Sequence, residues 1–205
     1  AAGFPLYFDA SGESSPTLAD LDGDGTLELV IATADGRVHA LDGGGAELPG
    51  WPVTTNLDVL HTGSAGFVSA AVSSQVHESI LSSVAVGDLD RDGTLEVVIA
   101  STQGRLYVFS AAGVLRTGFP VTTTPAFSDP AIRDEANRLD PGFFASPALA
   151  DLDNDGALEI IIGAMDRHLY VWRADGTPQA GFPILMVDRT VTTVSLATGK
   201  VTWNL

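Results

Sequence analysis

Short apolar segments recur along the chain and are separated by acidic or glycine-rich turns. Three runs of strand-forming residues are apolar without alternation, as expected for strands that are covered on both faces. Each run is preceded by a short apolar segment and followed by a turn and an alternating segment, which indicates further strands. The continuous runs are residues 29–32, 97–100 and 160–163, and the alternating segments are 38–41, 106–109 and 169–172.

The spacing of these segments is a repeat. From the first Asp of an acidic loop to the Gly of a Gly-aromatic-Pro triplet there are 30 residues in every unit: 20 to 50, 88 to 118 and 151 to 181. The stretches that lead from a triplet to the next loop instead vary, at 17, 38 and 33 residues. Constant units with variable joints are typical of repeat architectures.

Four strands per unit indicate blades of a β-propeller. The Pro of each triplet cannot donate to a ladder, which places the fourth strand at an outer edge. We therefore predict an all-β fold of three four-stranded antiparallel blades, at about residues 12–55, 80–123 and 143–186. A propeller closes with about four to eight blades. Three blades make an incomplete propeller or part of a larger one.

The loop after the first strand of each unit carries most of the candidate chemistry. Residues 20–28, 88–96 and 151–159 share carboxylates at loop positions 1, 3, 5 and 9 and a Gly at position 6. Four carboxylates so close together repel one another unless a cation lies between them. Oxygen donors without His or Cys suit Ca²⁺. The glycine permits a tight turn that leaves the carbonyl at position 7 (Thr26, Thr94 or Ala157) as a further ligand. The alternative is three solvated acidic turns.

These loops are not EF-hands. An EF-hand needs a bidentate Glu at position 12 and flanking helices. Position 12 is Ile31, Ile99 or Ile162, and strand formers follow each loop. We therefore place each loop in a β-hairpin.

These features resemble the FG-GAP (VCBS-repeat) family, which includes the integrin alpha-subunit propellers, over residues 3–184. The resemblance implies about three Ca²⁺ ions per chain, each bound between the first two strands of one blade. It also implies ligand recognition on the face away from Ca²⁺. The family often has Asp at position 9, where this chain has Glu, so that side chain could bind with both oxygens or through water. The implied ligands, with the carbonyls named above, are Asp20, Asp22, Asp24, Thr26 and Glu28; Asp88, Asp90, Asp92, Thr94 and Glu96; and Asp151, Asp153, Asp155, Ala157 and Glu159.

Composition and net charge limit the partners and the location that this protein can have. The net charge is −16, but twelve of the 26 acids belong to the three loops, which leaves 14 acids against 10 bases elsewhere. The few, scattered basic residues argue against a nucleic-acid partner, and no apolar stretch approaches the roughly 18 residues of a membrane span. There is no cysteine. Loops of this kind are useful where Ca²⁺ is near millimolar, so we expect a secreted or cell-surface protein.

Two inserts and a tail lie outside the repeat. The inserts, residues 54–79 and 122–143, should project from the end of the blades opposite the acidic loops. In the first, Val68, Val72, Val76 and Ile80 have helical spacing. In the second, residues 128–139 read as a short helix that is ended by residues 140–142. The tail, residues 187–205, reads as a hairpin.

Three functions fit this reading. The first is a non-catalytic module that binds a protein or glycan on the insert face, for adhesion or assembly. The second is part of a secreted, polysaccharide lyase-like enzyme, for which His61, Phe67, Arg133 and Arg138 are the candidates. The third is a structural subunit of a surface fibre. Further blades from the same polypeptide, a second copy or another protein are the expected partners. The roles of His61 and His77 stay open.

Overall fold

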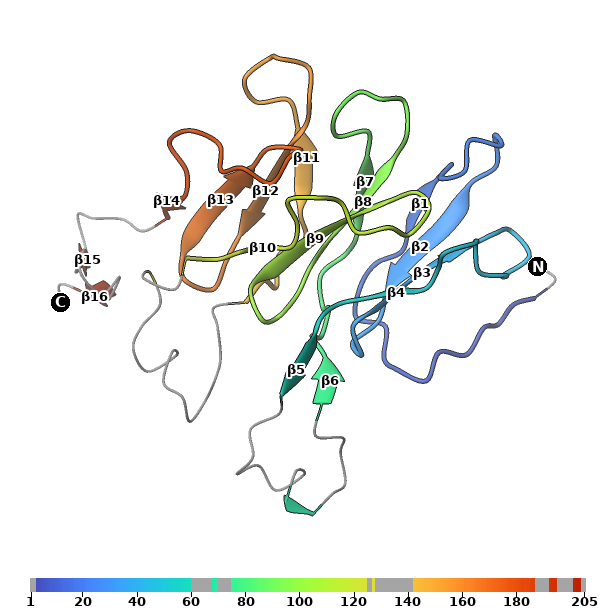
Figure 1. Cartoon of the computed structure of the whole chain (residues 1–205). Coiled ribbons are helices and arrows are strands. Elements are labelled where there is room, and N and C mark those ends of the chain that lie inside the picture. The colour runs from blue at the N-terminus through green and yellow to red at the C-terminus, as the bar shows by residue number, and fades with distance from the viewer. Residues whose placement is uncertain are drawn as a thin grey trace.

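The computed structural model describes residues 3–59, 68–69, 75–124, 127, 142–186, 192–194 and 201–203. Its elements are three four-stranded antiparallel sheets and two two-stranded hairpins (Figure 1). We call the sheets blades 1, 2 and 3. Within the ranges given above, the chain forms no helix long and apolar enough to cross a bilayer.

In each blade the strands follow one another as a meander. Blade 1 consists of β1 (Thr17–Ala19), β2 (Glu28–Ala32), β3 (Arg37–Leu41) and β4 (Val53–Thr54). Blade 2 consists of β7 (Ala85–Gly87), β8 (Glu96–Ala100), β9 (Arg105–Ser110) and β10 (Val121–Thr122). Blade 3 consists of β11 (Ala148–Ala150), β12 (Glu159–Gly163), β13 (His168–Trp172) and β14 (Ile184–Leu185).

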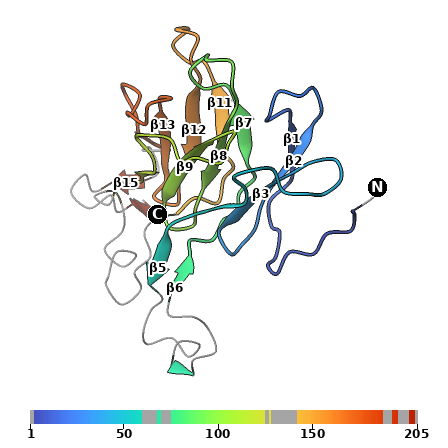
Figure 2. The same ribbon diagram turned by 45° about the vertical axis from the view of Figure 1, so that its right-hand side comes forward.

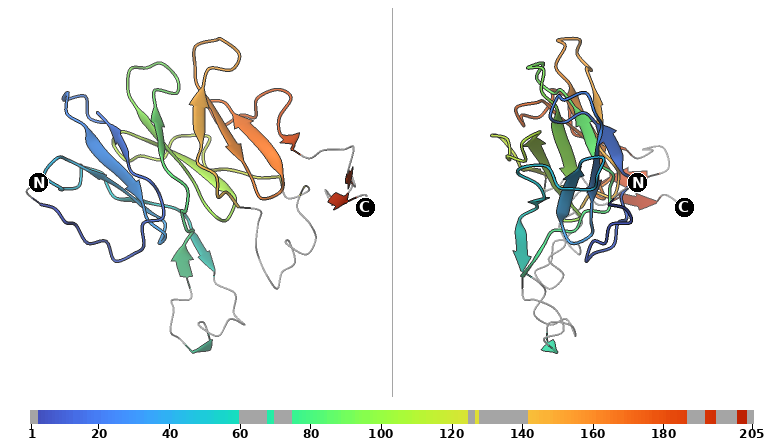
Figure 3. Two further views of the ribbon diagram at one scale, coloured as in Figure 1. Left: turned by 180° about the vertical axis from the view of Figure 1, so that it is seen from behind. Right: turned by 90° about the vertical axis from the view of Figure 1, so that its right-hand side faces the viewer.

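The blades stand side by side like a fan, and the fan does not close (Figures 1 and 3). The fold is thus a partial β-propeller, which confirms the predicted class. The loops between the first two strands of every blade project from one end, and the β5–β6 hairpin projects from the other (Figure 2). The predicted edge position of the fourth strand is also correct, since β4, β10 and β14 each end their sheet.

The core consists of two layers, one on each side of blade 2. Side chains on a strand alternate between its two faces, so β8 and β9 supply both layers. Val97, Ile99, Tyr107 and Phe109 face blade 1, whereas Val98, Ala100, Leu106 and Val108 face blade 3. All eight are buried. The prediction of a strand covered on both faces is confirmed for β8.

The outer blades are covered less completely. In β2, Val30 and Ala32 are buried but Leu29 and Ile31 are only partly so. In β12, Ile160 and Ile162 are buried and Ile161 is partly exposed. The same apolar run therefore has two covered faces only in the middle blade, because only that blade has a blade on each side.

The first insert contains strands where helical spacing was expected. β5 (Leu57–Val59) pairs with β6 (Gln75–His77), with Asp58 opposite Val76. A helix through Val76 is therefore wrong, because this segment takes its hydrogen bonds from the partner strand. Residues 70–74, and the helix predicted over residues 128–139, lie outside the described residues. In the tail, β15 (Thr192–Val194) pairs with β16 (Val201–Trp203).

The triplets share a local geometry that the sequence pattern did not reveal. The X-Pro bond is cis in all four, and the glycines have φ between 88° and 94°. The glycine of one triplet lies against the next blade. A Cβ on Gly50 would be 2.2 Å from the carbonyl oxygen of Ala112, and one on Gly118 would be 2.2 Å from that of Asp175. Only glycine allows this approach of two backbones.

Candidate metal centres

Each acidic loop connects the first two strands of its blade, as predicted. We call residues 20–28 loop 1, residues 88–96 loop 2 and residues 151–159 loop 3. The strand register closes the loop, because Ala19 pairs with Glu28 and so brings position 9 back beside position 1. Gly87 pairs with Glu96, and Ala150 with Glu159, in the same way.

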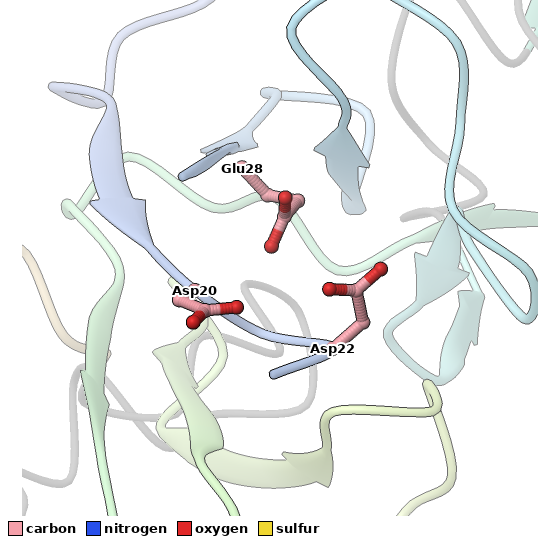
Figure 4. Close-up of side chains that lie close together, drawn as sticks. All are labelled: Asp20, Asp22 and Glu28. Atoms are coloured by element: carbon pink, nitrogen blue, oxygen red, sulfur yellow. The ribbon is translucent and has the colours of Figure 1, made fainter. Parts of the chain in front are cut away.

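Three carboxylates converge in every loop. In loop 1, Asp20, Asp22 and Glu28 each offer an oxygen, and these oxygens lie within 4.8 Å of one another. Figure 4 shows the three side chains around a common space. The equivalent groups are Asp88, Asp90 and Glu96 in loop 2, and Asp151, Asp153 and Glu159 in loop 3. The spacing of positions 1, 3 and 9 therefore produces the same cluster three times.

Backbone N–H groups hold the cluster in place. In loop 1, Gly25 N–H donates to Asp20 Oδ2 at 3.0 Å and Leu21 N–H donates to Glu28 Oε2 at 2.7 Å. Both bonds recur in loops 2 and 3. Glu28 is buried at the start of β2. One of its oxygens is engaged by the backbone, so the side chain closes the loop as well as contributing to the cluster.

Two loop positions have left-handed backbone. Position 6 is glycine in all three loops, with φ from 87° to 94°, as the tight turn requires. Position 4 is also left-handed and is occupied by Gly23, Arg91 and Asn154 with φ of 75°, 65° and 60°. We had not predicted this second position. Gly and Asn there are a recognisable signal, since both tolerate this region.

The Asp at position 5 behaves differently from the other three. Asp24 Oδ1 accepts bonds from the Thr26 hydroxyl and the Thr26 N–H, at 2.6 and 2.7 Å. These bonds stabilise the charged form and hold the pKa of Asp24 below its ordinary value. Asp92 is held likewise by Thr94. Position 5 does not belong to the converging groups, and its role as a ligand, like that of the carbonyls of Thr26, Thr94 and Ala157, stays a prediction.

Two buried carboxylate oxygens test whether a cation fits. Asp20 Oδ1 and Asp151 Oδ1 are buried and, in the described part of the chain, have no hydrogen-bond partner. Burying a carboxylate oxygen without a partner is costly. Each belongs to a converging cluster, where a bound cation would supply the missing interaction. The donor set therefore fits a hard divalent ion.

Loop 2 has no such oxygen. Asp88 Oδ1 accepts a bond from Asp92 N–H at 3.1 Å. The guanidinium of Arg116 contacts Asp90 and also Glu96, the latter at 2.7 Å. The bond to Asp90 raises the pKa of Arg116. Burial nevertheless dominates at Glu96, whose pKa lies above its ordinary value.

The histidines of the described chain are engaged in local contacts. His39 Nδ1 bonds Glu47, and its ring lies 4.4 Å from that of Phe8. His77 Nδ1 bonds the Thr55 carbonyl at 2.6 Å. His168 Nδ1 lies 3.0 Å from the Asp166 carbonyl. His61, Phe67, Arg133 and Arg138 lie outside the described residues.

Two buried tyrosines connect neighbouring blades, and they were predicted only as strand residues. Tyr107 accepts a bond from Asn56 N–H and donates to Glu78. Tyr170 accepts from Thr124 N–H and donates to Asp166. Burial raises the pKa of both phenols far above the physiological range. They remain protonated and have a structural role.

Comparison with one solved structure supports the fold. The chain superposes on the C-terminal domain of PilY1 from Pseudomonas aeruginosa with a TM-score of 0.50 and 16% identity, covering 81% of this chain and 39% of that one. BamB from Moraxella catarrhalis gives a TM-score of 0.47 at 16% identity, with 84% and 37% covered. BBS1N in complex with ARL6DN gives 0.42 at 16% identity, with 90% and 60% covered. The chain thus spans less than two thirds of each of these structures.

The sequence comparison identifies the repeat. No match is found among curated proteins. The model of the FG-GAP-like repeat matches residues 20–99 and again residues 88–162, so that the two matches share loop 2 and together include all three loops. Because these matches cover more than half of the sequence, the chain belongs to the FG-GAP-like repeat family.

Proposed function

We propose that this chain is a calcium-binding module of an extracellular β-propeller that binds other macromolecules and does not catalyse a reaction. The observation that carries the proposal is the threefold convergence of carboxylates, with buried, unpartnered oxygens at Asp20 and Asp151. The residues that would hold the ion are those at positions 1, 3 and 9 of each loop. Bound Ca²⁺ would neutralise the mutual repulsion of these groups.

The chemistry favours calcium among the common cations. Each cluster consists of carboxylate oxygens alone, without His or Cys, which argues against zinc and copper. Calcium accepts irregular oxygen shells, whereas magnesium needs a nearly octahedral one and retains its waters. Each loop joins two strands of one blade, so an ion bound there would stabilise the blade. Its binding energy would become folding energy.

Melting of the 205-residue chain tests this proposal. We expect the melting temperature to fall by several degrees when a chelator replaces millimolar Ca²⁺, and Mg²⁺ to restore little of the loss. Asp22→Ala, which removes one member of the loop 1 cluster, should reduce the calcium-dependent part of the melt. Glu13→Ala removes the same charge from an exposed position outside the loops and should leave it unchanged. Identical melting curves in calcium and in chelator would refute the proposal.

Recognition is proposed for the insert face. The β5–β6 hairpin projects from the end opposite the metal loops (Figure 1). Its base is held by buried Glu78, which contacts Arg105 and Tyr107 of blade 2. A projecting loop on a rigid scaffold is a common place for binding residues. Replacing residues 59–75 by Asn-Gly would join the two strands in a short hairpin. This change should abolish partner binding but preserve the calcium-dependent melt, and binding that survives it would refute the assignment of faces.

An assembly role is supported by the open fan. Apolar side chains at its two ends are exposed, among them Leu18, Leu27 and Leu152. Further blades would cover them, whether they come from the same polypeptide, a second copy or a different protein. Sedimentation of the chain in calcium tests this, and a monodisperse monomer would contradict association with a second copy. A lyase-like function has no support from the described residues, and its test is activity on a panel of acidic polysaccharides.

A further inference from the structure

The three metal loops have the same acids but different neighbours at one equivalent position. This position lies two residues before the triplet glycine and is occupied by Leu48 in blade 1, Arg116 in blade 2 and Gln179 in blade 3. Its backbone is the same in all three blades. The N–H groups of these residues donate to the carbonyls of Ala40, Val108 and Val171, at 2.8 to 2.9 Å. At this position the blades therefore differ only in the side chain.

In blade 2 this side chain contacts the metal cluster. The guanidinium of Arg116 forms ion pairs with Asp90 and Glu96, which are two of the three converging acids. A single guanidinium thus supplies positive charge where a metal ion would otherwise do so. The third acid, Asp88, has both oxygens engaged by backbone N–H groups. The cluster in loop 2 is satisfied by the protein itself.

In blade 3 the contact is weaker, and in blade 1 it is replaced by an apolar one. Gln179 Nε2 donates to Asp153 Oδ2 at 3.0 Å. The guanidinium of Arg173, which is more exposed than that of Arg116, lies 3.4 Å from the same oxygen. Leu48 instead packs against the core between blades 1 and 2. The unpartnered buried oxygens also set loop 2 apart, since they occur at Asp20 and Asp151 but not at Asp88. Two observations therefore distinguish loop 2 from the other loops, and the side chain at the equivalent position alone distinguishes loop 3 from loop 1.

We propose that Arg116 is a built-in counter-cation that lowers the affinity of loop 2 for calcium and keeps the middle blade folded without the ion. A divalent ion that enters loop 2 must displace the guanidinium from the carboxylates of Asp90 and Glu96, and it is repelled by the positive charge of Arg116. The affinity should therefore be highest in loop 1, intermediate in loop 3 and lowest in loop 2. This inference rests on the proposed calcium binding.

The grading has a structural consequence. Blade 2 contributes to both core layers, so unfolding of this blade would expose both layers to water. When calcium falls, the outer blades should lose their ions and loosen while the middle blade retains its fold. The arrangement makes the two ends of the module calcium-sensitive and its centre calcium-independent.

Calcium titration by calorimetry, on 205-residue variants with one intact loop, tests the inference. Asp22→Ala with Asp153→Ala leaves loop 2, and Asp90→Ala with Asp153→Ala leaves loop 1. We expect loop 2 alone to bind at least about tenfold more weakly than loop 1 alone. Adding Arg116→Leu to the loop 2 variant should remove most of this difference, and Arg116→Lys only part of it.

A charge-matched control separates the local effect from net charge. Arg37, the first residue of β3, pairs with Asp35 in the turn that precedes it, away from the loops. Arg37→Leu removes the same charge and should change the affinity less than about twofold, because exposed distant charges are screened. If it strengthens binding as much as Arg116→Leu does, Arg116 has no special role.

Hydrogen exchange on the unmodified chain makes the test independent of how the variants fold. The N–H groups of Gly25, Gly93 and Gly156 each donate to the position 1 carboxylate. On chelation, exchange at Gly25 and Gly156 should accelerate much more than at Gly93. Equal acceleration, or equal affinities that Arg116→Leu leaves unchanged, would overturn the inference but not calcium binding. No heat of binding and no effect of chelation would overturn both.

Discussion

Blades 2 and 3 are built from the same repeat, but the faces that they turn toward the following blade have different surroundings. Blade 3 covers this face of blade 2, whereas no described blade covers this face of blade 3. On blade 2, the triplet glycine Gly118 meets the turn of blade 3, and Leu89 of loop 2 is fully buried. On blade 3, the equivalent Gly181 has no described atom within 4 Å of a Cβ built on it, and the equivalent Leu152 is 46% exposed. The residues are identical, and only the neighbour is missing.

This difference shows what the repeated residues are for. The triplet glycine is not needed only for the turn in its own blade, because its close contact is with the following blade. The first triplet behaves in the same way, since a Cβ on Gly3 would lie 1.8 Å from the carbonyl oxygen of Gly44 in blade 1. A structural unit therefore extends from one triplet across the next blade. Three of the four triplets have this partner among the described residues.

The largest expected effect comes from replacing these glycines. Gly118→Ala should lower the free energy of unfolding by more than about 3 kcal/mol, and Gly181→Ala by about 1–2 kcal/mol. The two glycines have φ of 94° and 90°, so the backbone strain is matched. The excess loss at Gly118 comes from the clash with the Asp175 carbonyl. Urea unfolding of both variants measures the difference, and equal losses would show that the contact between blades contributes nothing.

The second comparison concerns the leucines at loop position 2. Leu89→Ala should cost about 2–5 kcal/mol, because it leaves a cavity in the core layer between blades 2 and 3. Leu152→Ala should cost less than about 1 kcal/mol, because about half of that residue is already exposed to solvent. Chemical denaturation of the two variants is the measurement. A large loss at Leu152 would indicate that its face is covered in solution.

The sequence predicted the parts of this molecule that depend on local order. Strand period, the proline at the edge strand and the glycine at loop position 6 follow from residue type and spacing, and so the blades and the acidic loops could be placed. The contact of Arg116 with Asp90 joins residues far apart in the chain, and no local pattern indicates it. The left-handed Arg91 was missed because arginine carries no preference for that conformation.

Burial, too, was predictable only in part. The runs that form β2, β8 and β12 are equally apolar, yet only β8 is covered on both faces. Which face is covered depends on the number of neighbouring blades, and this is not written into the strand itself. The same holds for the insert, where Val76 fits a helical spacing but lies in a strand because Asp58 offers a partner.

The smallest expected effect concerns the third strand, where the blade contacts differ in kind. Tyr107 bonds the Asn56 N–H of blade 1's joint and the buried Glu78, whereas the equivalent His39 of blade 1 bonds Glu47. Tyr107→Phe should cost about 1–3 kcal/mol, since it leaves a buried carboxylate oxygen without its donor. His39→Phe should cost less than about 1 kcal/mol, because Glu47 is partly exposed and can bond water instead. Thermal unfolding at fixed calcium measures both. Tyr170→Phe, whose hydroxyl bonds Thr124 and Asp166, should resemble Tyr107→Phe. If it instead resembles His39→Phe, the tyrosine bonds between blades do not determine stability.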